Sequence, residues 1–249
     1  MTSQRIVSVV PSQTELLFDL GLDEEVAGIT KFCIHPANKV KGKTLVGGTK
    51  TLQLDKIQAL NPTLILANKE ENMRHQIEEL QRQYAVHVTD INTLPEALAM
   101  IREVGVLVGK SAEADIMART IDSSFHSLPI THTPSVAYFI WRKPYMVAAS
   151  DTFIHAMLER AGFQNVFASQ SRYPEISPTD LQLANPDLIF LSSEPYPFTQ
   201  KHVAELKAIC PSARIVLVDG EMFSWYGSRL LQASNYFRNL RNEITRQHS

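Results

Sequence analysis

The feature that most constrains the fold of this chain is an alternation of short apolar segments with amphipathic ones. Ile6–Val10 and Thr63–Ala67 contain no charged residue, which is typical of strands buried on both faces of a parallel sheet. Glu71–Tyr84 has the periodicity of a helix. The alternation predicts an α/β protein whose parallel sheets are covered by helices. The other predicted strands are Val26–Thr30, Val86–Thr89, Val136–Ile140, Leu188–Leu191 and Arg214–Val218, and the other predicted helices are Thr14–Leu20, Asp55–Leu60, Thr152–Ala161, Gln200–Ala208 and Ser228–Arg246.

Residues 94–128 lack this alternation and carry apolar side chains at a helical period. Gly105 and Gly109 weaken the middle of the segment, so we expect a kink or a break there. Two interpretations remain open. The segment is either a pair of ordinary packed helices or a helical spine that joins two lobes.

The two halves of the chain contain related segments. Ile57–Ile65 reads Ile-Gln-Ala-Leu-Asn-Pro-Thr-Leu-Ile, and Leu181–Ile189 reads Leu-Gln-Leu-Ala-Asn-Pro-Asp-Leu-Ile. Each combines a helix end, an Asn-Pro turn and the start of a buried strand. The sequence therefore predicts two α/β lobes with mainly parallel sheets, residues 1–93 and 129–249, joined by a long helical spine at residues 94–128.

Charge and cysteine content exclude several classes of protein. The 249 residues include 24 basic and 26 acidic side chains, so the basic excess of a nucleic-acid-binding protein is missing. Two cysteines make neither a disulfide framework nor a four-ligand zinc site. The sequence has no run of about 20 apolar residues that could span a membrane and no secretory signal. We expect a monomer in the cytoplasm, or in the periplasm or on the cell surface if a leader has been removed.

Aromatic and charged residues follow the predicted strands, and ligands of open α/β sheets bind beyond the carboxyl ends of the strands. Both tryptophans, Trp141 and Trp225, lie at such positions. They suit a flat ligand; the alternative is that they cover the cores of the lobes. We expect aromatic side chains to stack on the ligand, while its polar rim contacts Lys31, Lys50, Lys69, Arg142 and Glu221.

No motif in the sequence supports catalysis. The chain lacks G-x-x-x-x-G-K-[ST], G-x-G-x-x-G, G-x-S-x-G and H-E-x-x-H. Cys33 and His35 are the candidate metal ligands, but two ligands fall short of a closed zinc site. We therefore predict no catalytic residue, no metal site and no cofactor.

Short motifs along most of the chain resemble those of the class III periplasmic binding proteins. They include Arg5–Leu16, which contains Val-Val-Pro-Ser-Gln-Thr-Glu, and Ala161–Phe167, which reads Ala-Gly-Phe-Gln-Asn-Val-Phe, together with Asn185–Ile189 and Gly227–Leu230. These proteins, also called helical-backbone metal receptors, are the solute receptors of ATP-driven importers for cobalamin, haem and ferric siderophores. The resemblance is closest to the cobalamin-receptor branch. It implies two lobes, a rigid helix between them and a ligand in the shallow cleft.

The resemblance also implies which residues contact the ligand and the permease. Asp55 matches the acid with which the first lobe docks on the permease, whereas Thr179 occupies the second docking position and Asp180 follows it. Asn68 stands where cobalamin receptors carry tryptophan, so a smaller or more charged metal chelate fits as well. The implied ligand contacts are Ser12, Gln13, Lys31, Phe32, Thr49, Lys50, Asn68, Lys69, Glu70, Trp141, Arg142, Tyr173, Glu221, Phe223 and Trp225.

Three hypotheses about function follow. The first is a solute-binding protein of an ABC-type importer, which binds a metal chelate of the cobalamin, haem or ferric-siderophore type in the cleft. The second is a cytoplasmic chelatase-like or metal-dependent enzyme that uses Cys33, His35 or the pair Glu70 and Glu71. The third is a scaffold that kept the fold and lost the ligand.

Overall fold

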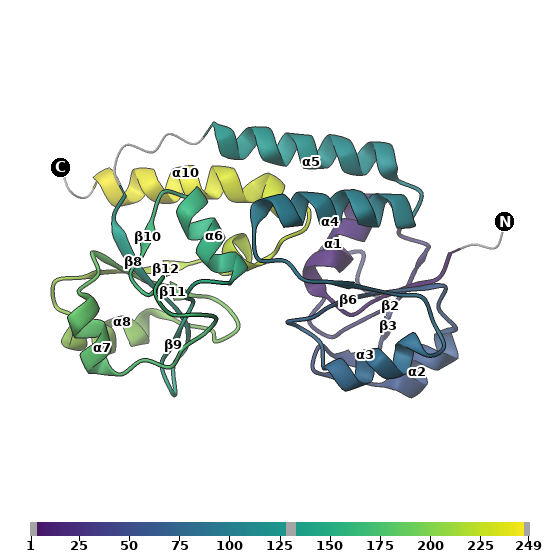
Figure 1. Cartoon of the computed structure of the whole chain (residues 1–249), viewed down its shortest axis with the longest axis horizontal. Coiled ribbons are helices and arrows are strands. Elements are labelled where there is room, and N and C mark those ends of the chain that lie inside the picture. The colour runs from purple at the N-terminus through teal and green to yellow at the C-terminus, as the bar shows by residue number, and fades with distance from the viewer. Residues whose placement is uncertain (1–3, 128–132, 247–249) are drawn as a thin grey trace. The chain divides into compact units, whose positions relative to one another are not determined.

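The computed structural model describes residues 4–127 and 133–246 of the chain (Figure 1). Its contacts divide the chain into two compact units, each with its own sheet. No helix within the described ranges is both long and apolar enough to cross a membrane. Where described, unit 1 consists of Met1–Ile91, Ala97–Thr120 and Trp225–Arg229, and unit 2 consists of Asn92–Glu96, Ile121–Ser224 and Leu230–Ser249.

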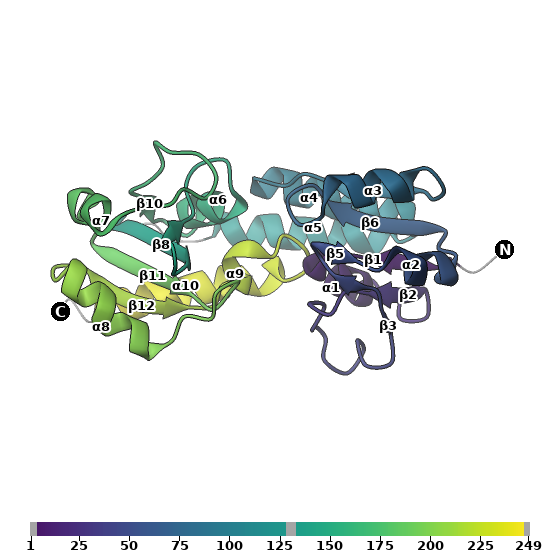
Figure 2. The same ribbon diagram turned by 90° about the horizontal axis from the view of Figure 1, so that it is seen from below.

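Unit 1 is built on a five-stranded parallel sheet in the order β3-β2-β1-β6-β7. Every residue of the neighbouring strands β1 and β6 is buried, as expected for strands covered on both faces. Helix α1 lies on one face of the sheet, and α2 and α3 lie on the other (Figures 1 and 2). The strands are β1 (Ile6–Ser8), β2 (Val26–Ile29), β3 (Thr44–Leu45), β6 (Leu64–Asn68) and β7 (Val86–Thr89), with a separate hairpin of β4 (Gly47–Gly48) and β5 (Thr51–Leu52); the helices are α1 (Pro11–Asp19), α2 (Leu54–Leu60) and α3 (Arg74–Gln81).

Unit 2 has a parallel sheet in the order β10-β8-β11-β12, and β9 pairs with β8 in the antiparallel direction. Helices α6 and α10 lie on one face of this sheet, and α7 and α8 lie on the other (Figure 1). The strands are β8 (Ser135–Trp141), β9 (Met146–Val147), β10 (Gln164–Asn165), β11 (Leu188–Ser192) and β12 (Arg214–Val218); the helices are α6 (Phe153–Arg160), α7 (Pro178–Ala184), α8 (Gln200–Ile209), α9 (Glu221–Ser224) and α10 (Leu230–Arg246).

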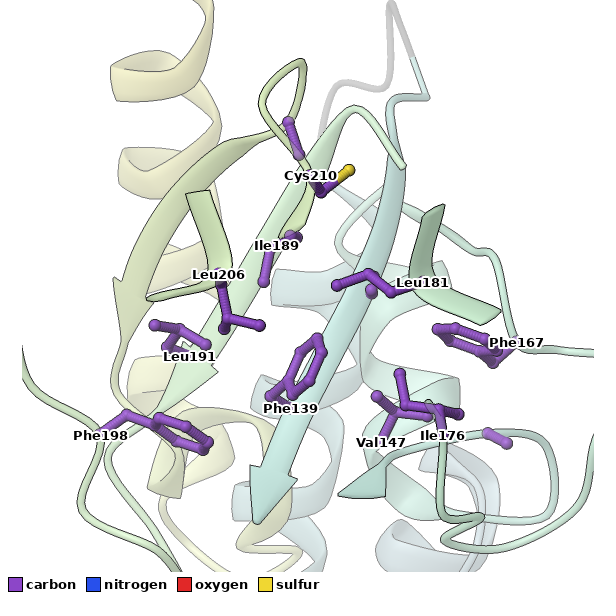
Figure 3. Close-up of a cluster of buried hydrophobic side chains, with 13 residues drawn as sticks. Phe139, Val147, Phe167, Ile176, Leu181, Ile189, Leu191, Phe198, Leu206 and Cys210 are labelled. Atoms are coloured by element: carbon purple, nitrogen blue, oxygen red, sulfur yellow. The ribbon is translucent and has the colours of Figure 1, made fainter. Parts of the chain in front are cut away.

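The core of unit 2 on the side of α7 and α8 is formed by alternate strand residues (Figure 3). Phe139 of β8 and Ile189 and Leu191 of β11 point to the same face, because successive side chains of a strand point to opposite faces. They pack with Leu181 of α7 and Leu206 of α8, and all five side chains are buried. This packing fixes the two helices on the sheet.

The predicted fold class of mixed α/β structure with parallel sheets is confirmed. The order β2-β1-β6-β7 in unit 1 corresponds to β10-β8-β11-β12 in unit 2. The two related segments occupy equivalent places, since α2 leads through Asn61 to β6 and α7 leads through Asn185 to β11. Both asparagines have left-handed backbone conformations, with φ of 43° and 42°. Asparagine tolerates this conformation better than most residues, which explains the repeated Asn-Pro turn.

The structure differs from the sequence prediction in short elements and helix boundaries. Helix α1 begins at Pro11 rather than at Thr14, because proline suits the first turn of a helix. The strands β3, β4, β5, β9 and β10 each contain two residues, which is too short for a periodic pattern to appear.

The helical segment expected at residues 94–128 consists of two helices, α4 (Leu94–Leu107) and α5 (Ser111–His126). The chain turns at Gly109, whose φ is +71°. A Cβ atom added at Gly105 would lie 2.3 Å from the Cβ of Ala114, so the glycine lets α4 and α5 pack closely. The predicted break is therefore present. The last residue of the predicted spine, Leu128, lies outside the described residues.

Asn61 offers a test of the repeated turn. Asn61→Ala should lower the free energy of unfolding by about 1 kcal/mol, because alanine pays a steric cost in the left-handed conformation. Asn61→Gly should cost less, because glycine adopts this conformation freely. Urea denaturation of the two variants measures both values, and equal losses would contradict the explanation.

Candidate functional site

In unit 1, β1 lies between β2 and β6, and in unit 2, β8 lies between β10 and β11. The crevices at the carboxyl ends of β1 and β6, and of β8 and β11, are therefore the expected ligand positions in open α/β sheets. The predicted site residues lie in the loops around these strand ends and in segments packed against them.

Two asparagines organise the loops of unit 1. The Nδ2 of Asn68 donates to the backbone oxygen of Thr89 at 3.1 Å, and its Oδ1 accepts from the backbone N–H groups of Glu70 and Glu71. Asn72 Nδ2 donates to the backbone oxygens of Val9 and Thr49 at 3.1 and 3.0 Å. Asn68 is buried, and its side chain holds the loop together. A ligand contact through Asn68 stays a prediction that this geometry does not favour.

An aromatic residue with a lysine beside it lies on the surface of unit 1. The Phe32 side chain is 50% exposed, and the Nζ of Lys31 lies 5.0 Å from the centre of its ring. Lys50 Nζ donates to the backbone oxygen of Glu70 at 2.5 Å. Lys69 Nζ pairs with Asp90 Oδ2 at 2.6 Å. These groups offer an apolar surface beside positive charge.

The first turn of α1 contributes buried polar residues. Ser12 and Gln13 are both buried, and Gln13 Nε2 donates to Thr89 Oγ1 at 2.7 Å. Among the described residues, Gln13 Oε1 is one of the few buried side-chain atoms without a hydrogen-bond partner. Thr49 is half-buried, and its backbone oxygen accepts the hydrogen bond from Asn72. The side chains of Ser12 and Gln13 are therefore not part of the exposed surface around Phe32.

Trp225 lies in unit 1, although the sequence analysis assigned it to the C-terminal lobe. The segment Trp225–Arg229 is held on α1 by a buried ion pair, in which Arg229 donates to the two carboxylate oxygens of Glu15 at 2.7 and 3.0 Å. The Arg229 guanidinium lies 5.2 Å from the Trp225 ring, and the His35 ring meets the tryptophan edge-on at 5.5 Å. Burial raises the pKa of the Glu15 carboxyl, and Arg229 opposes the rise. No local pattern reveals a pair separated by 214 positions.

Trp141 is the exposed tryptophan of unit 2. Its side chain is 40% exposed at the end of β8, and its Nε1 donates to the backbone oxygen of Lys143 at 3.2 Å. Arg142 was expected to contact the polar rim of the ligand. Its guanidinium instead forms an ion pair with Glu205. Tyr173 is half-buried, and the Arg172 guanidinium lies 5.7 Å from the centre of its ring. Glu221 is half-buried in the first turn of α9.

The predicted contact of Phe223 with a ligand is not compatible with its position. Phe223 has no exposed surface and packs in the core of unit 2, 4.7 Å from the Phe237 ring and 5.2 Å from the Tyr138 ring. Its place after a strand suggested a ligand contact. Helix α9 turns the side chain into the core instead, which the sequence pattern does not indicate.

The candidate metal ligands and catalytic groups are occupied by other contacts. The Cys33 sulfur is buried, 3.1 Å from Thr14 Oγ1 and 3.2 Å from Thr30 Oγ1, and burial raises the pKa of the thiol. Tyr226 donates to the Glu71 carboxylate at 2.8 Å. Within the described ranges, no three His, Cys, Asp or Glu side chains are arranged to hold a metal ion.

The two candidate docking acids differ in their surroundings. Asp55 is exposed in the first turn of α2. Asp180 is exposed in the first turn of α7, where its carboxylate accepts from the N–H and the hydroxyl of Ser177 at 2.8 and 2.7 Å. These hydrogen bonds lower the pKa of Asp180, and they give its side chain a helix-capping role.

Comparisons with known proteins agree with this architecture. A family model described as periplasmic binding protein matches residues 6–208. A vitamin B12-binding protein of Pectobacterium carotovorum is 24% identical over 243 residues, which cover 93% of this chain and 86% of that protein.

Two solved structures have the same fold. The periplasmic heme-binding protein RhuT from Roseiflexus sp. RS-1 has a TM-score of 0.80 at 22% identity, with 95% of this chain and 98% of that chain covered. The periplasmic vitamin B12 binding protein BtuF of Vibrio cholerae has a TM-score of 0.81 at 20% identity, with 97% and 98% covered.

The buried ion pair gives a prediction about stability and pH. Arg229→Met should lower the free energy of unfolding by about 3–5 kcal/mol at neutral pH, because Glu15 is left buried and unpaired. Without Arg229 the pKa of Glu15 rises further, so the folded variant holds a proton that the unfolded chain releases above pH 4.5. Its stability should therefore fall as the pH rises from that value.

Urea denaturation between pH 5 and 8 measures this dependence. Arg74→Met is the matched control, since the Arg74 side chain is 91% exposed and pairs with Glu78 on the surface. The assigned role of the buried pair would be contradicted if Arg229→Met lost no more free energy of unfolding than Arg74→Met. It would also be contradicted if the loss in Arg229→Met did not change with pH.

Proposed function

The chain belongs to the periplasmic binding protein family, and from that premise we propose that it is the solute-binding protein of an ABC-type importer. The observation that carries the proposal is an exposed aromatic side chain near the carboxyl edge of each sheet. Phe32 serves unit 1 and Trp141 serves unit 2. Large aromatic residues are usually buried, so the exposure of Phe32 beyond β2 and of Trp141 at the end of β8 supports ligand binding.

We propose a metal chelate of the cobalamin, haem or ferric-siderophore type as the ligand. Curated relatives and structural neighbours are named for binding vitamin B12 and heme. Phe32 and Trp141 offer apolar surfaces to the flat part of such a ligand. Lys31 and Lys50 suit carboxylates on its rim. The metal belongs to the cargo, and the protein needs no cofactor of its own.

The hypothesis of an enzyme receives less support. A reactive cysteine needs a lowered pKa and access to solvent, whereas Cys33 is buried and its pKa is raised. Glu71 accepts a hydrogen bond from Tyr226, so it is engaged within the protein. Binding without catalysis is the function that these residues favour.

The family also suggests the partner and the location that we propose for this protein. The partner is an ABC permease, with Asp55 and Asp180 as the docking residues of the two units. The place of action is then the periplasm or the cell surface. The cytoplasmic location expected from the N-terminus has no support in the family match.

A thermal-shift screen tests the proposed function. Purified protein is heated with corrinoids, haem and ferric siderophores, and a ligand at 100 times its dissociation constant should stabilise the fold by about 2.7 kcal/mol. Stabilisation by at least one of these metal chelates is the expected result. The proposal fails if no chelate raises the melting temperature, or if turnover of a chelate is detected.

A pair of aromatic variants separates binding from folding. Trp141→Ala should weaken chelate binding roughly tenfold or more, which is about 1.4 kcal/mol, because an exposed aromatic contact is lost. Phe223→Ala should destabilise the fold by about 3–5 kcal/mol and leave the affinity of the folded protein unchanged. Fluorescence titration and urea denaturation measure the two effects, and the reverse pattern would contradict the assignment.

A further inference from the structure

A single carboxylate holds the loop that carries Trp141. This loop, residues 141–146, joins β8 to β9 and is called here the Trp141 hairpin. Arg142 donates to Glu205 Oε2 through Nε at 3.0 Å and Nη2 at 2.5 Å. The hydroxyl of Tyr145 donates to the other oxygen, Glu205 Oε1. Glu205 lies on α8, so the helix holds the hairpin at two points.

A second side chain of α8 acts on the tryptophan through Tyr196. The buried His202 accepts from the Thr199 N–H at its Nδ1, at 2.9 Å. The neutral ring therefore carries its proton on Nε2, which donates to the Tyr196 hydroxyl at 3.1 Å. The Tyr196 ring meets the Trp141 ring edge-on at 5.6 Å and packs against Phe198 at 4.8 Å. His202 thus fixes the ring beside the tryptophan.

The two residues lie on the same side of α8, because they are three positions apart. The ion pair of Arg142 and Glu205 is half-exposed, with 27% and 34% of the side chains accessible. Pairs of this exposure add little to stability. The hairpin already has an apolar anchor, since Tyr145 packs on Phe139 at 5.6 Å. The contacts of Glu205 therefore restrict the geometry of the hairpin more than they stabilise the fold.

We propose that Glu205 and His202 are positioning residues that hold Trp141 in its binding orientation before the ligand arrives. The inference rests on the proposed function, in which Trp141 contacts the ligand. An exposed tryptophan loses side-chain freedom when a ligand binds, and this loss opposes binding. Holding the ring in advance removes that cost, and the Nε1 bond of Trp141 to Lys143 acts in the same direction.

Fluorine NMR of the full chain labelled with 5-fluorotryptophan tests the proposal. The chain has two tryptophans, and Trp141→Phe assigns their resonances. In the unaltered protein, the Trp141 signal should differ in shift from free fluorotryptophan and relax as part of the folded protein. Glu205→Ala should move the signal towards the free value and make its relaxation that of a mobile ring. The chelate selected by the thermal-shift screen should bind about fivefold more weakly.

Controls on the same helix and hairpin make the result decisive. Lys201→Ala changes an exposed residue of α8 and should leave the Trp141 signal and the affinity unchanged. Tyr145→Phe removes one donor to Glu205 and should have a smaller effect in the same direction. Tyr145→Phe also replaces Glu205→Ala as the test variant if Glu205→Ala does not fold. His202→Gln should loosen the ring through Tyr196.

The outcomes separate this inference from the proposed function. If the unaltered protein binds no chelate, the proposed function fails, while the Trp141 signal still reports whether Glu205 holds the ring. The inference is overturned if the folded Glu205→Ala variant, or Tyr145→Phe in its place, shows the same Trp141 signal and affinity as Lys201→Ala.

Discussion

Unit 1 depends on the buried ion pair between Glu15 and Arg229. It joins positions 214 residues apart and fixes the segment Trp225–Arg229 on α1. Burying two charges is costly, and the cost is offset only when the geometry is good and both groups are hydrogen-bonded. The two-point contact meets this requirement. Gly227 approaches α1 closely, since an added Cβ would lie 2.4 Å from the backbone oxygen of Ser12. The glycine therefore allows the segment Trp225–Arg229 to lie on α1.

The sequence predicts those parts of the fold that local patterns encode. Buried strands such as β6 and β11, and the Asn-Pro turns at Asn61 and Asn185, depend on a few neighbouring residues and were predicted correctly. The place of Trp225 in unit 1 depends on the ion pair of Arg229 with the distant Glu15, and local patterns could not predict it. Phe223 shows the same limit for the site, because the orientation of α9, rather than the residue type, decides that its ring enters the core.

The side-chain contacts of the described loops support the proposed function of ligand binding. The buried side chains of Asn68 and Asn72 hydrogen-bond to backbone groups of the loops, which gives the loops a fixed shape. The exposed aromatic side chains of these loops, Phe32 and Trp141, carry no titratable atom. Fixed loops with exposed aromatic surfaces suit the recognition of a preformed, flat molecule.

Hydrogen exchange measured by mass spectrometry, with and without the chelate that stabilises the protein most, tests the central claim directly. The account predicts slower exchange in the loop 31–35 of unit 1 and in the Trp141 hairpin of unit 2, since these segments carry the exposed aromatic residues. The helices α2 and α7 should exchange at unchanged rates. Unchanged exchange in both loops at a saturating concentration of the chelate, or protection confined to other segments, would contradict the account.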